Sequence, residues 1–329
     1  MDESREQPLP PFDGQTGRGG ANPEYLTVPI PARDRLWRHV VLFALTFVTT
    51  TVVGAGHFYS FSLGFNPPAD AVPDLTDPLF YLRGFWYSLT ILAILGCHEM
   101  GHYLACRYYR VDATLPFFLP APLPLTGTLG AFIRIRSRMP SKVALFDIGL
   151  AGPIAGFIIA VPALFIGLGL SMLDRVPADF NGVELGEPLL FRAAAWMVWG
   201  TAPDGMSINM HPMAFAAWFG LLATALNLFP LGQLDGGHVA YAVLGRRSTL
   251  LTLGTVVVAI GLTFVSSSWV VWTVLMVVML LVIGPRHPPT LDDSSPLGTA
   301  RIALAVVGLI MLVVCFTPAP IEPFVTGTQ

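Results

Sequence analysis

Residues 84–105 read GFWYSLTILAILGCHEMGHYLA, an apolar run that carries His98, Glu99 and His102 near its end. A helix of about 20 apolar residues crosses a hydrocarbon core of about 30 Å. On such a helix the two histidines lie on one face, one turn apart. Ionisable groups inside a membrane helix are costly and are functional by default. We interpret the two histidines as ligands of one Zn²⁺, with Glu99 beside them as general base.

The rest of the chain has the composition of a polytopic membrane protein. Hydrophobic residues make up 53% and charged residues 12% of its 329 positions, and the mean hydropathy is +0.64. So few charges cannot cover a water-facing surface of this size. The net charge of −3 indicates no nucleic-acid partner, and three cysteines are too few for a disulfide framework. These numbers exclude a secreted disulfide scaffold, a nucleic-acid-binding domain and an ordinary cytosolic enzyme.

The apolar runs predict an all-α polytopic membrane protein with about seven transmembrane helices. The runs are 37–56, 84–105, 143–172, 212–230, 249–267, 269–284 and 299–317. Only Ser266, Ser267 and Ser268 separate the fifth run from the sixth. That pair is therefore either a tight helical hairpin or one distorted element.

The basic residues predict the orientation of these spans. With seven crossings and the N-terminus inside, only Arg83, Arg175 and Arg192 of the 18 basic residues fall outside. We therefore expect a cytoplasmic N-terminus and an outer C-terminus. No organelle-targeting segment precedes the first span, which favours a prokaryotic plasma membrane.

The chain divides into one long domain with a tail at each end. The polar, Pro- and Gly-rich residues 1–35 predict a disordered cytoplasmic tail. Residues 36–318 are the predicted intramembrane domain, with a catalytic core at approximately 84–245. Residues 319–329 form a C-terminal tail.

Residues 112–142 do not fit a simple helix. Four prolines in nine positions (Pro116, Pro120, Pro122 and Pro124) break helices, and the alternating stretch 129–136 predicts a short strand or hairpin. Non-helical backbone at membrane depth is tolerated only inside protein or along a watery cavity. We expect a short membrane-associated β-hairpin or re-entrant segment near the active site.

A hydrolytic zinc site needs a third protein ligand and one open position. Asp235 is the strongest candidate, in Asn227-Leu-Phe-Pro-Leu-Gly-Gln-Leu-Asp-Gly-Gly-His238. Pro230 has no N–H, so the helix should open there and leave the Leu226 carbonyl without its helical partner. His211 and His238 stay open as ligands by residue type, whereas His39, His57 and His287 lie at span ends, where an interfacial role is favoured.

Taken together, these motifs resemble the site-2 protease family. The resemblance rests on His98-Glu-Met-Gly-His102 in an early span and on Asn227-Leu-Phe-Pro230 with Leu234-Asp-Gly-Gly237 in a later one. Residues 127–132 (GTLGAF) and 151–156 (AGPIAG) are also similar to family motifs. The likeness is close over residues 90–245 and loose in the flanking spans.

The resemblance implies an intramembrane zinc metalloprotease with one Zn²⁺ per chain. By position, His98 and His102 match the zinc-binding histidines, Glu99 the catalytic glutamate and Asp235 the third ligand. Asn227 matches an asparagine close to the metal, where it donates to the oxyanion or holds two helices together. About 70 residues separate Gly156 from Asn227, which is too few for an inserted PDZ domain, so the chain resembles a minimal branch.

The implied substrate is a single-span membrane protein cut within or near its transmembrane segment, as in regulated intramembrane proteolysis. Its selection then rests on the membrane core, in contact with the lipid bilayer, or on a separate regulatory or adaptor protein. Two other classes stay open. One is a non-hydrolytic metal transporter or sensor, and the other is an unrelated membrane zinc peptidase that serves an aqueous chamber.

Overall fold

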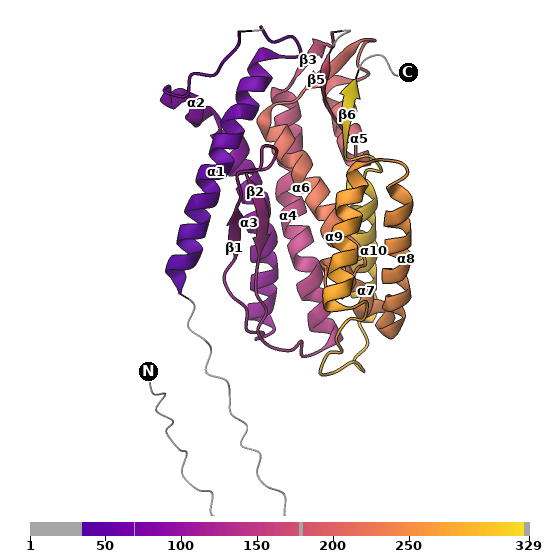
Figure 1. The fold of residues 1–329 in the computed structure, drawn as a ribbon. Coiled ribbons are helices and arrows are strands. Elements are labelled where there is room, and N and C mark those ends of the chain that lie inside the picture. Colours follow the sequence, from indigo (N-terminus) through magenta and orange to yellow (C-terminus); the bar gives the residue numbers. More distant parts are fainter. Residues whose placement is uncertain (1–34, 69, 178–179, 326–329) are drawn as a thin grey trace, which may run out of the picture. The chain divides into compact units, whose positions relative to one another are not determined.

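The computed structural model describes residues 35–68, 70–177 and 180–325, and this part of the chain is mostly helical with three two-stranded sheets. The helices are α1 (Leu36–Leu63), α2 (Pro78–Arg83), α3 (Phe85–Tyr108), α4 (Lys142–Leu170), α5 (Leu189–Trp199), α6 (Pro212–Leu228), α7 (Asp235–Leu244), the 3₁₀ turn η1 (Gly245–Arg247), α8 (Ser248–Leu262), α9 (Ser268–Ile283) and α10 (Gly298–Cys315). The strands are β1 (Phe117–Pro120), β2 (Thr128–Phe132), β3 (Met172–Arg175), β4 (Asn181–Leu185), β5 (Met206–Asn209) and β6 (Ile321–Val325). The long helices run side by side, and α4 packs against α3, α6 and α7 (Figure 1).

Five helical segments of the described chain are long and apolar enough to cross a membrane. They are Leu36–Leu63, Pro78–Tyr108, Lys142–Leu170, Asp235–Leu262 and Gly298–Cys315. Three shorter apolar helices, Leu189–Trp199, Pro212–Leu228 and Ser268–Val282, fall below that length. The predicted count of seven spans is therefore not confirmed. α6 stops short of a full span because Pro230 follows its end.

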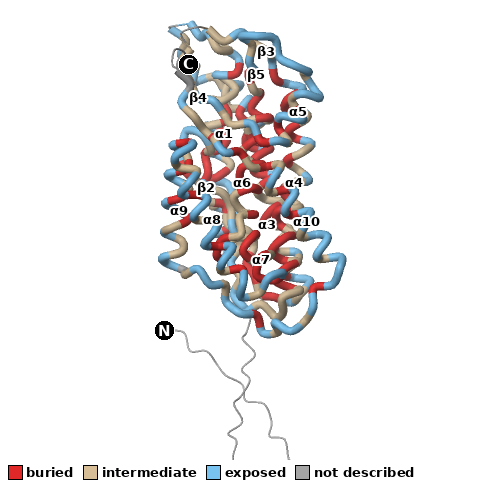
Figure 2. Tube along the Cα trace, turned by 90° about the vertical axis from the view of Figure 1, so that its right-hand side faces the viewer, coloured by how far each residue is buried: buried red, intermediate tan, exposed pale blue. Residues whose placement is uncertain are grey.

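The burial pattern fits a protein that faces lipid. Buried residues follow the centre of the helix bundle, and exposed ones lie on its outside (Figure 2). Leu164 of α4 and Trp218 of α6 are fully buried, whereas Val257 of α8 and Leu281 of α9 are exposed. In water, an apolar surface of this extent would drive aggregation. In a bilayer it is the surface that the hydrocarbon covers.

The proline-rich region after α3 folds back on itself. β1 pairs antiparallel with β2, from Phe117 opposite Phe132 to Pro120 opposite Thr128. The ladder continues beyond the strands, because Thr114 N–H donates to the Arg134 carbonyl at 3.0 Å. Among the described residues, no strand pairs with the other edge of β2. That edge therefore offers backbone groups to a further extended segment.

α1 packs against β1 through a buried histidine. His39 Nδ1 lies 3.0 Å from the Pro116 carbonyl oxygen, and its ring stacks against Phe117. The expected interfacial role of His39 is wrong, because this contact buries the side chain.

Pro230 separates α6 from α7 in a tightly closed break. As predicted, the Leu226 carbonyl lacks its helical partner at residue 230, but it is not left unpaired, because the Phe229 N–H donates to it at 3.3 Å. The helix thus ends in a short turn at Leu228 rather than in an open gap. A Cβ on Gly236 would lie 1.9 Å from the Leu228 carbonyl oxygen, so only glycine allows this return.

Two small sheets cap the end of the bundle opposite to the start of α1 (Figure 1). β3 pairs with β5, and β4 pairs with β6, all antiparallel. The pairing of β6 holds residues 321–325 of the predicted C-terminal tail against β4. Residues 326–329, and residues 1–34 of the predicted N-terminal tail, lie outside the described part of the chain.

Close contact between α1 and the start of α3 gives a stability prediction. A Cβ on Gly54 would lie 2.5 Å from the Gly84 carbonyl oxygen and 2.7 Å from Tyr87 Cβ, whereas a Cβ on Gly56 would meet nothing within 4 Å. Gly54→Val should therefore lower the free energy of unfolding by about 1–3 kcal/mol relative to Gly56→Val. Thermal unfolding in detergent micelles measures the difference. Equal melting temperatures for the two variants would contradict the packing.

Candidate metal centre

α3 places three of the predicted site residues together. His98, Glu99 and His102 are all buried in its C-terminal half. The four-residue spacing puts both imidazoles on one face, with their Nε2 atoms 3.1 Å apart. Glu99 Oε1 lies 3.9 Å from His98 Nε2.

Asp235, the first residue of α7, reaches the same point from the break after α6. Its Oδ2 lies 3.2 Å from His98 Nε2 and 3.3 Å from His102 Nε2. The three ligand atoms thus form a nearly equilateral triangle. The structure brings together all three residues predicted to hold the metal.

This donor set fits Zn²⁺. Ligand atoms at about 2.0–2.1 Å from a tetrahedral zinc are separated by about 3.3 Å, which matches the triangle. His102 Nδ1 lies 2.7 Å from the Ile148 carbonyl oxygen, which can only accept a hydrogen bond. The proton is therefore on Nδ1, and the Nε2 lone pair is free for a metal. Two imidazoles and a carboxylate with an open fourth position are typical of a hydrolytic zinc site.

Glycines of α4 make room for the two imidazoles. A Cβ on Gly152 would lie 2.0 Å from His102 Nε2, and one on Gly156 would lie 3.2 Å from His98 Cβ. A Cβ on Gly101 of α3 would in turn lie 2.5 Å from the Ala151 carbonyl oxygen. Small residues of this kind let two membrane helices approach closely. These glycines therefore serve the candidate metal centre as well as helix packing.

Two more groups border the ligands. The Asn227 side-chain nitrogen lies 3.3 Å from His98 Nε2, so α6 adds an amide to the site. The backbone N–H of Ile133, just after β2, faces the Glu99 carboxylate. The alternation of residues 129–136 predicted extended chain near the site, but nothing in the sequence placed the Ile133 N–H at Glu99 or the Ile148 carbonyl at His102, because backbone groups act there regardless of residue type.

The alternative histidines lie elsewhere. His211 caps the start of α6, where its Nδ1 accepts the Met213 N–H at 3.2 Å. His238 contacts His287 instead, and its Nδ1 lies 2.7 Å from His287 Nε2. Neither joins the group of His98, His102 and Asp235.

With this geometry in place, comparison with known proteins decides the family. The profile of Peptidase family M50 matches residues 86–268, which span α3 to the start of α9. The chain belongs to Peptidase family M50, the site-2 protease family. No solved structure matches the chain.

Plant proteins are among the relatives of this M50 chain. It is 29% identical to the probable zinc metalloprotease EGY1, chloroplastic, of Arabidopsis thaliana, over 94% of this chain and 59% of that protein. It is 30% identical to the probable zinc metalloprotease EGY2, chloroplastic, of Oryza sativa subsp. indica, over 73% of this chain and 44% of that protein. The chain thus spans less than two thirds of the length of these relatives.

The contact of Gly152 with His102 predicts a metal-binding defect. In Gly152→Ala the added methyl occupies the place of His102 Nε2, so zinc content should fall from about one ion per chain to near zero. Gly169→Ala on the same helix is the control, because its Cβ would meet nothing within 4 Å. Metal analysis of the two purified variants measures the outcome. Full zinc occupancy in Gly152→Ala would refute the assignment of His102.

Proposed function

We propose that this chain is an intramembrane zinc metalloprotease that hydrolyses a peptide bond within or near the transmembrane segment of a membrane protein. His98, His102 and Asp235 are its zinc ligands, and Glu99 is its general base. The observation that carries the proposal is the convergence of three ligand atoms within 3.3 Å of one another, from two buried histidines and the half-buried Asp235, with Glu99 alongside. Membership of family M50 supports the reaction class.

The residues of the site suggest a separate role for each group in peptide hydrolysis. Zn²⁺ bound there supplies a Lewis acid that lowers the pKa of water toward about 7 and polarises a carbonyl. Glu99 takes the proton of the attacking water and gives it to the leaving amine. Asn227 donates a hydrogen bond to the developing oxyanion, a contact whose loss costs about 10²–10³ in rate. The Ile133 N–H holds the Glu99 carboxylate in place.

The substrate must present an extended segment to this site. A helical peptide hides its carbonyls in internal hydrogen bonds, so it has to unwind before attack. We propose that the unwound segment pairs with the free edge of β2, in the manner of β-strand addition. The nearness of Ile133 to Glu99 supports this, because a strand added there passes the general base. The β1–β2 pair is then the membrane-associated hairpin of the site.

We further propose seven crossings, with α6 and α7 as one crossing interrupted at residues 229–234. Gly245, at the end of α7, has a φ of +60°, which favours a reversal there, and α8 then packs back against α7. α1, α3, α4, α8, α9 and α10 supply the other six crossings, so the segment Asp235–Leu262 is divided between two of them. An odd number suits a chain whose α1 begins at one end of the bundle and whose β6 lies at the other (Figure 1).

In this arrangement the basic ends of the helices face the cytoplasm, with the N-terminus inside and the C-terminus outside. The protease domain then covers residues 36–318, with its catalytic core at approximately 84–245. A prokaryotic plasma membrane remains our prediction for this chain, whereas the plant relatives are named chloroplastic. A separate adaptor or regulatory protein is a further candidate partner.

A metal transporter or sensor is the weaker proposal. Such a protein needs ligands that exchange with solvent, and it has no use for a buried carboxylate beside the metal. Glu99 is buried 3.9 Å from His98 Nε2 and faces a backbone donor, which suits a base better than a carrier.

Glu99 and Asp235 separate hydrolysis from metal binding. Glu99→Gln should keep the zinc and lose cleavage by at least about 10²-fold, because the amide cannot accept the proton. Asp235→Ala should lose both zinc and cleavage. Metal analysis and a cleavage assay on a single-span substrate, run on both variants, give the readout. Retention of proteolysis by Glu99→Gln would remove that residue from the scheme.

The free edge of β2 gives a second test. Arg134 uses its N–H to bind Thr114 Oγ1, so the N–H groups of Ile133 and Ile135 point to the free edge. Ile135→Pro should cut cleavage by about tenfold or more without loss of zinc, because it removes one donor for the substrate. Ile135→Ala keeps that N–H and should stay near wild type. If both variants cleave equally well, the strand only roofs the cavity.

A further inference from the structure

A cavity of about 470 Å³ opens beside the metal centre. Residues 135–139, which continue the chain after β2, form one wall, and residues 287–291 form another. Gln233 and His238, from the segment that carries Asp235, and Leu145 of α4 complete it. The cavity therefore shares its α7 wall with a metal ligand.

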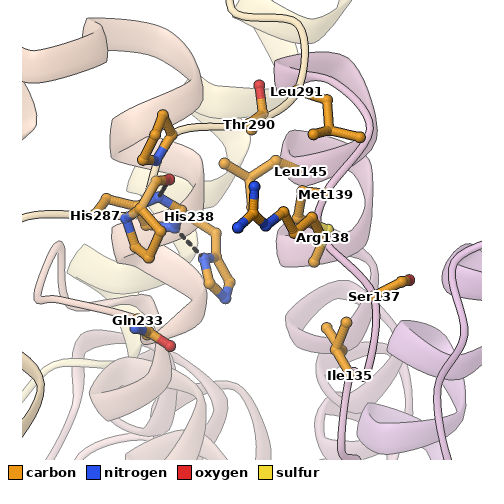
Figure 3. A pocket seen from close by; sticks show the side chains of 12 residues that line it. Ile135, Ser137, Arg138, Met139, Leu145, Gln233, His238, His287, Thr290 and Leu291 are labelled. Carbon is orange, nitrogen blue, oxygen red and sulfur yellow. Dashed lines mark hydrogen bonds between the residues drawn. The ribbon is translucent and has the colours of Figure 1, made fainter. Parts of the chain in front are cut away.

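Arg138 supplies positive charge to this cavity. Figure 3 shows its side chain extending from the 135–139 segment into the space toward His238 and His287. Among the described residues, no hydrogen bond or ion pair engages the guanidinium, although its neighbour Arg136 pairs with Asp112 at 3.8 Å. A guanidinium without a partner is a ready site for a carboxylate.

The two histidines add no charge. His287 Nδ1 lies 2.7 Å from the Pro288 carbonyl oxygen, which only accepts, so the proton of His287 is on Nδ1. Its Nε2 then accepts from His238 Nδ1 at 2.7 Å. Burial lowers the pKa of His287 below its ordinary value, which also favours the neutral ring.

The nearby carboxylates are bound elsewhere. Asp292 accepts from Ser294 at 2.6 Å, and Asp293 accepts from Tyr241 at 2.7 Å. Neither lines the cavity. Ser137 Oγ accepts the Asp112 N–H at 3.0 Å, so its own hydroxyl proton is free to donate into the cavity. The lining thus offers a cation and neutral donors, and no described carboxylate.

The cavity lies where a substrate strand would arrive after it passes Glu99. Ile133 faces Glu99, and Ile135 lines the cavity. Two residues of extended chain cover about 7 Å, and side chains two apart lie on the same face. A peptide paired with this edge would place a residue about two positions from the scissile bond at the mouth of the cavity.

We propose that this cavity is a carboxylate subsite of the protease, in which Arg138 binds an acidic group of the peptide close to the scissile bond. The inference rests on the proposed function. Arg138 is a specificity-determining residue here, because it selects the peptide and takes no part in proton transfer. The carboxylate comes either from an Asp or Glu side chain of the substrate or from the new C-terminus of the cleaved product.

The first arm of the test measures selectivity. Asp, Asn or Lys is placed singly at each of the three positions on either side of the scissile bond of a single-span substrate, and kcat/KM is measured. In the wild type, Asp should exceed Lys at one position, about two residues from the bond, by about tenfold or more. Arg138→Glu should reverse the order at that position. A general loss of stability would lower kcat/KM for the Asp, Asn and Lys substrates together and leave their order unchanged.

Arg134→Glu is the matched control, because it makes the same charge change on the same segment at a residue that does not line the cavity. This variant should keep the wild-type order. The Glu99→Gln variant tests the proposed function separately. Cleavage that survives in it refutes the protease mechanism, whereas normal dependence on Glu99 with an unchanged substrate order in Arg138→Glu excludes a substrate side chain as the source of the carboxylate.

The second arm identifies the source of the carboxylate. The N-terminal product peptide, with a free C-terminus or as its amide, is added to the wild type and to Arg138→Gln. Stronger inhibition of the wild type by the free acid, lost in Arg138→Gln, assigns the cavity to the product C-terminus. A reversal of substrate order in the first arm assigns it to a side chain. Absence of both effects overturns the proposal.

Discussion

The close approach of α3 and α4 is the constraint on which the metal centre depends. Gly101 and Gly152 leave no space between the helices for a side chain of any size. Because α4 lies so near, the Ile148 carbonyl reaches His102 Nδ1 and fixes the tautomer that a metal ligand requires. The same contact therefore sets both the packing of the two helices and the orientation of His102, since a larger residue on either helix would change both.

The break after α6 brings two side chains to the site that one continuous helix would hold apart. α6 carries Asn227 to His98, and the turn at Pro230 lets the chain restart at Asp235 on the same side of the site. Gly236 permits the return because its backbone lies directly against the Leu228 carbonyl. A straight helix would place residues 227 and 235 two turns apart, about 12 Å along the axis. The break brings both groups to His98.

The region after β2 joins binding to chemistry in a similar way. Ile133 faces Glu99, the proposed general base, and the next residues form the wall of the cavity that holds Arg138. This continuity was not predictable from the alternation of residues 129–136, which indicated only extended chain. The His238–His287 pair was equally hidden, because 49 residues separate its members and each histidine has several ordinary roles. The count of helices long enough to span a membrane also differed, because two of the predicted spans, α6 and α9, are shorter than a full crossing: Pro230 follows the end of α6, and α9 ends before Gly284.

The sequence by itself determined the membrane class, the helix that carries His98, Glu99 and His102, and the choice of Asp235 as partner. Composition and a four-residue spacing are local properties, so they can be read along the chain. Only the tertiary structure decided that Asp235 lies 3.2 Å from His98, that a backbone carbonyl orients His102, and that Arg138 faces a cavity without a described partner. These features arise where distant segments meet, and the distance between two such segments is set by packing rather than by the residues of either one alone.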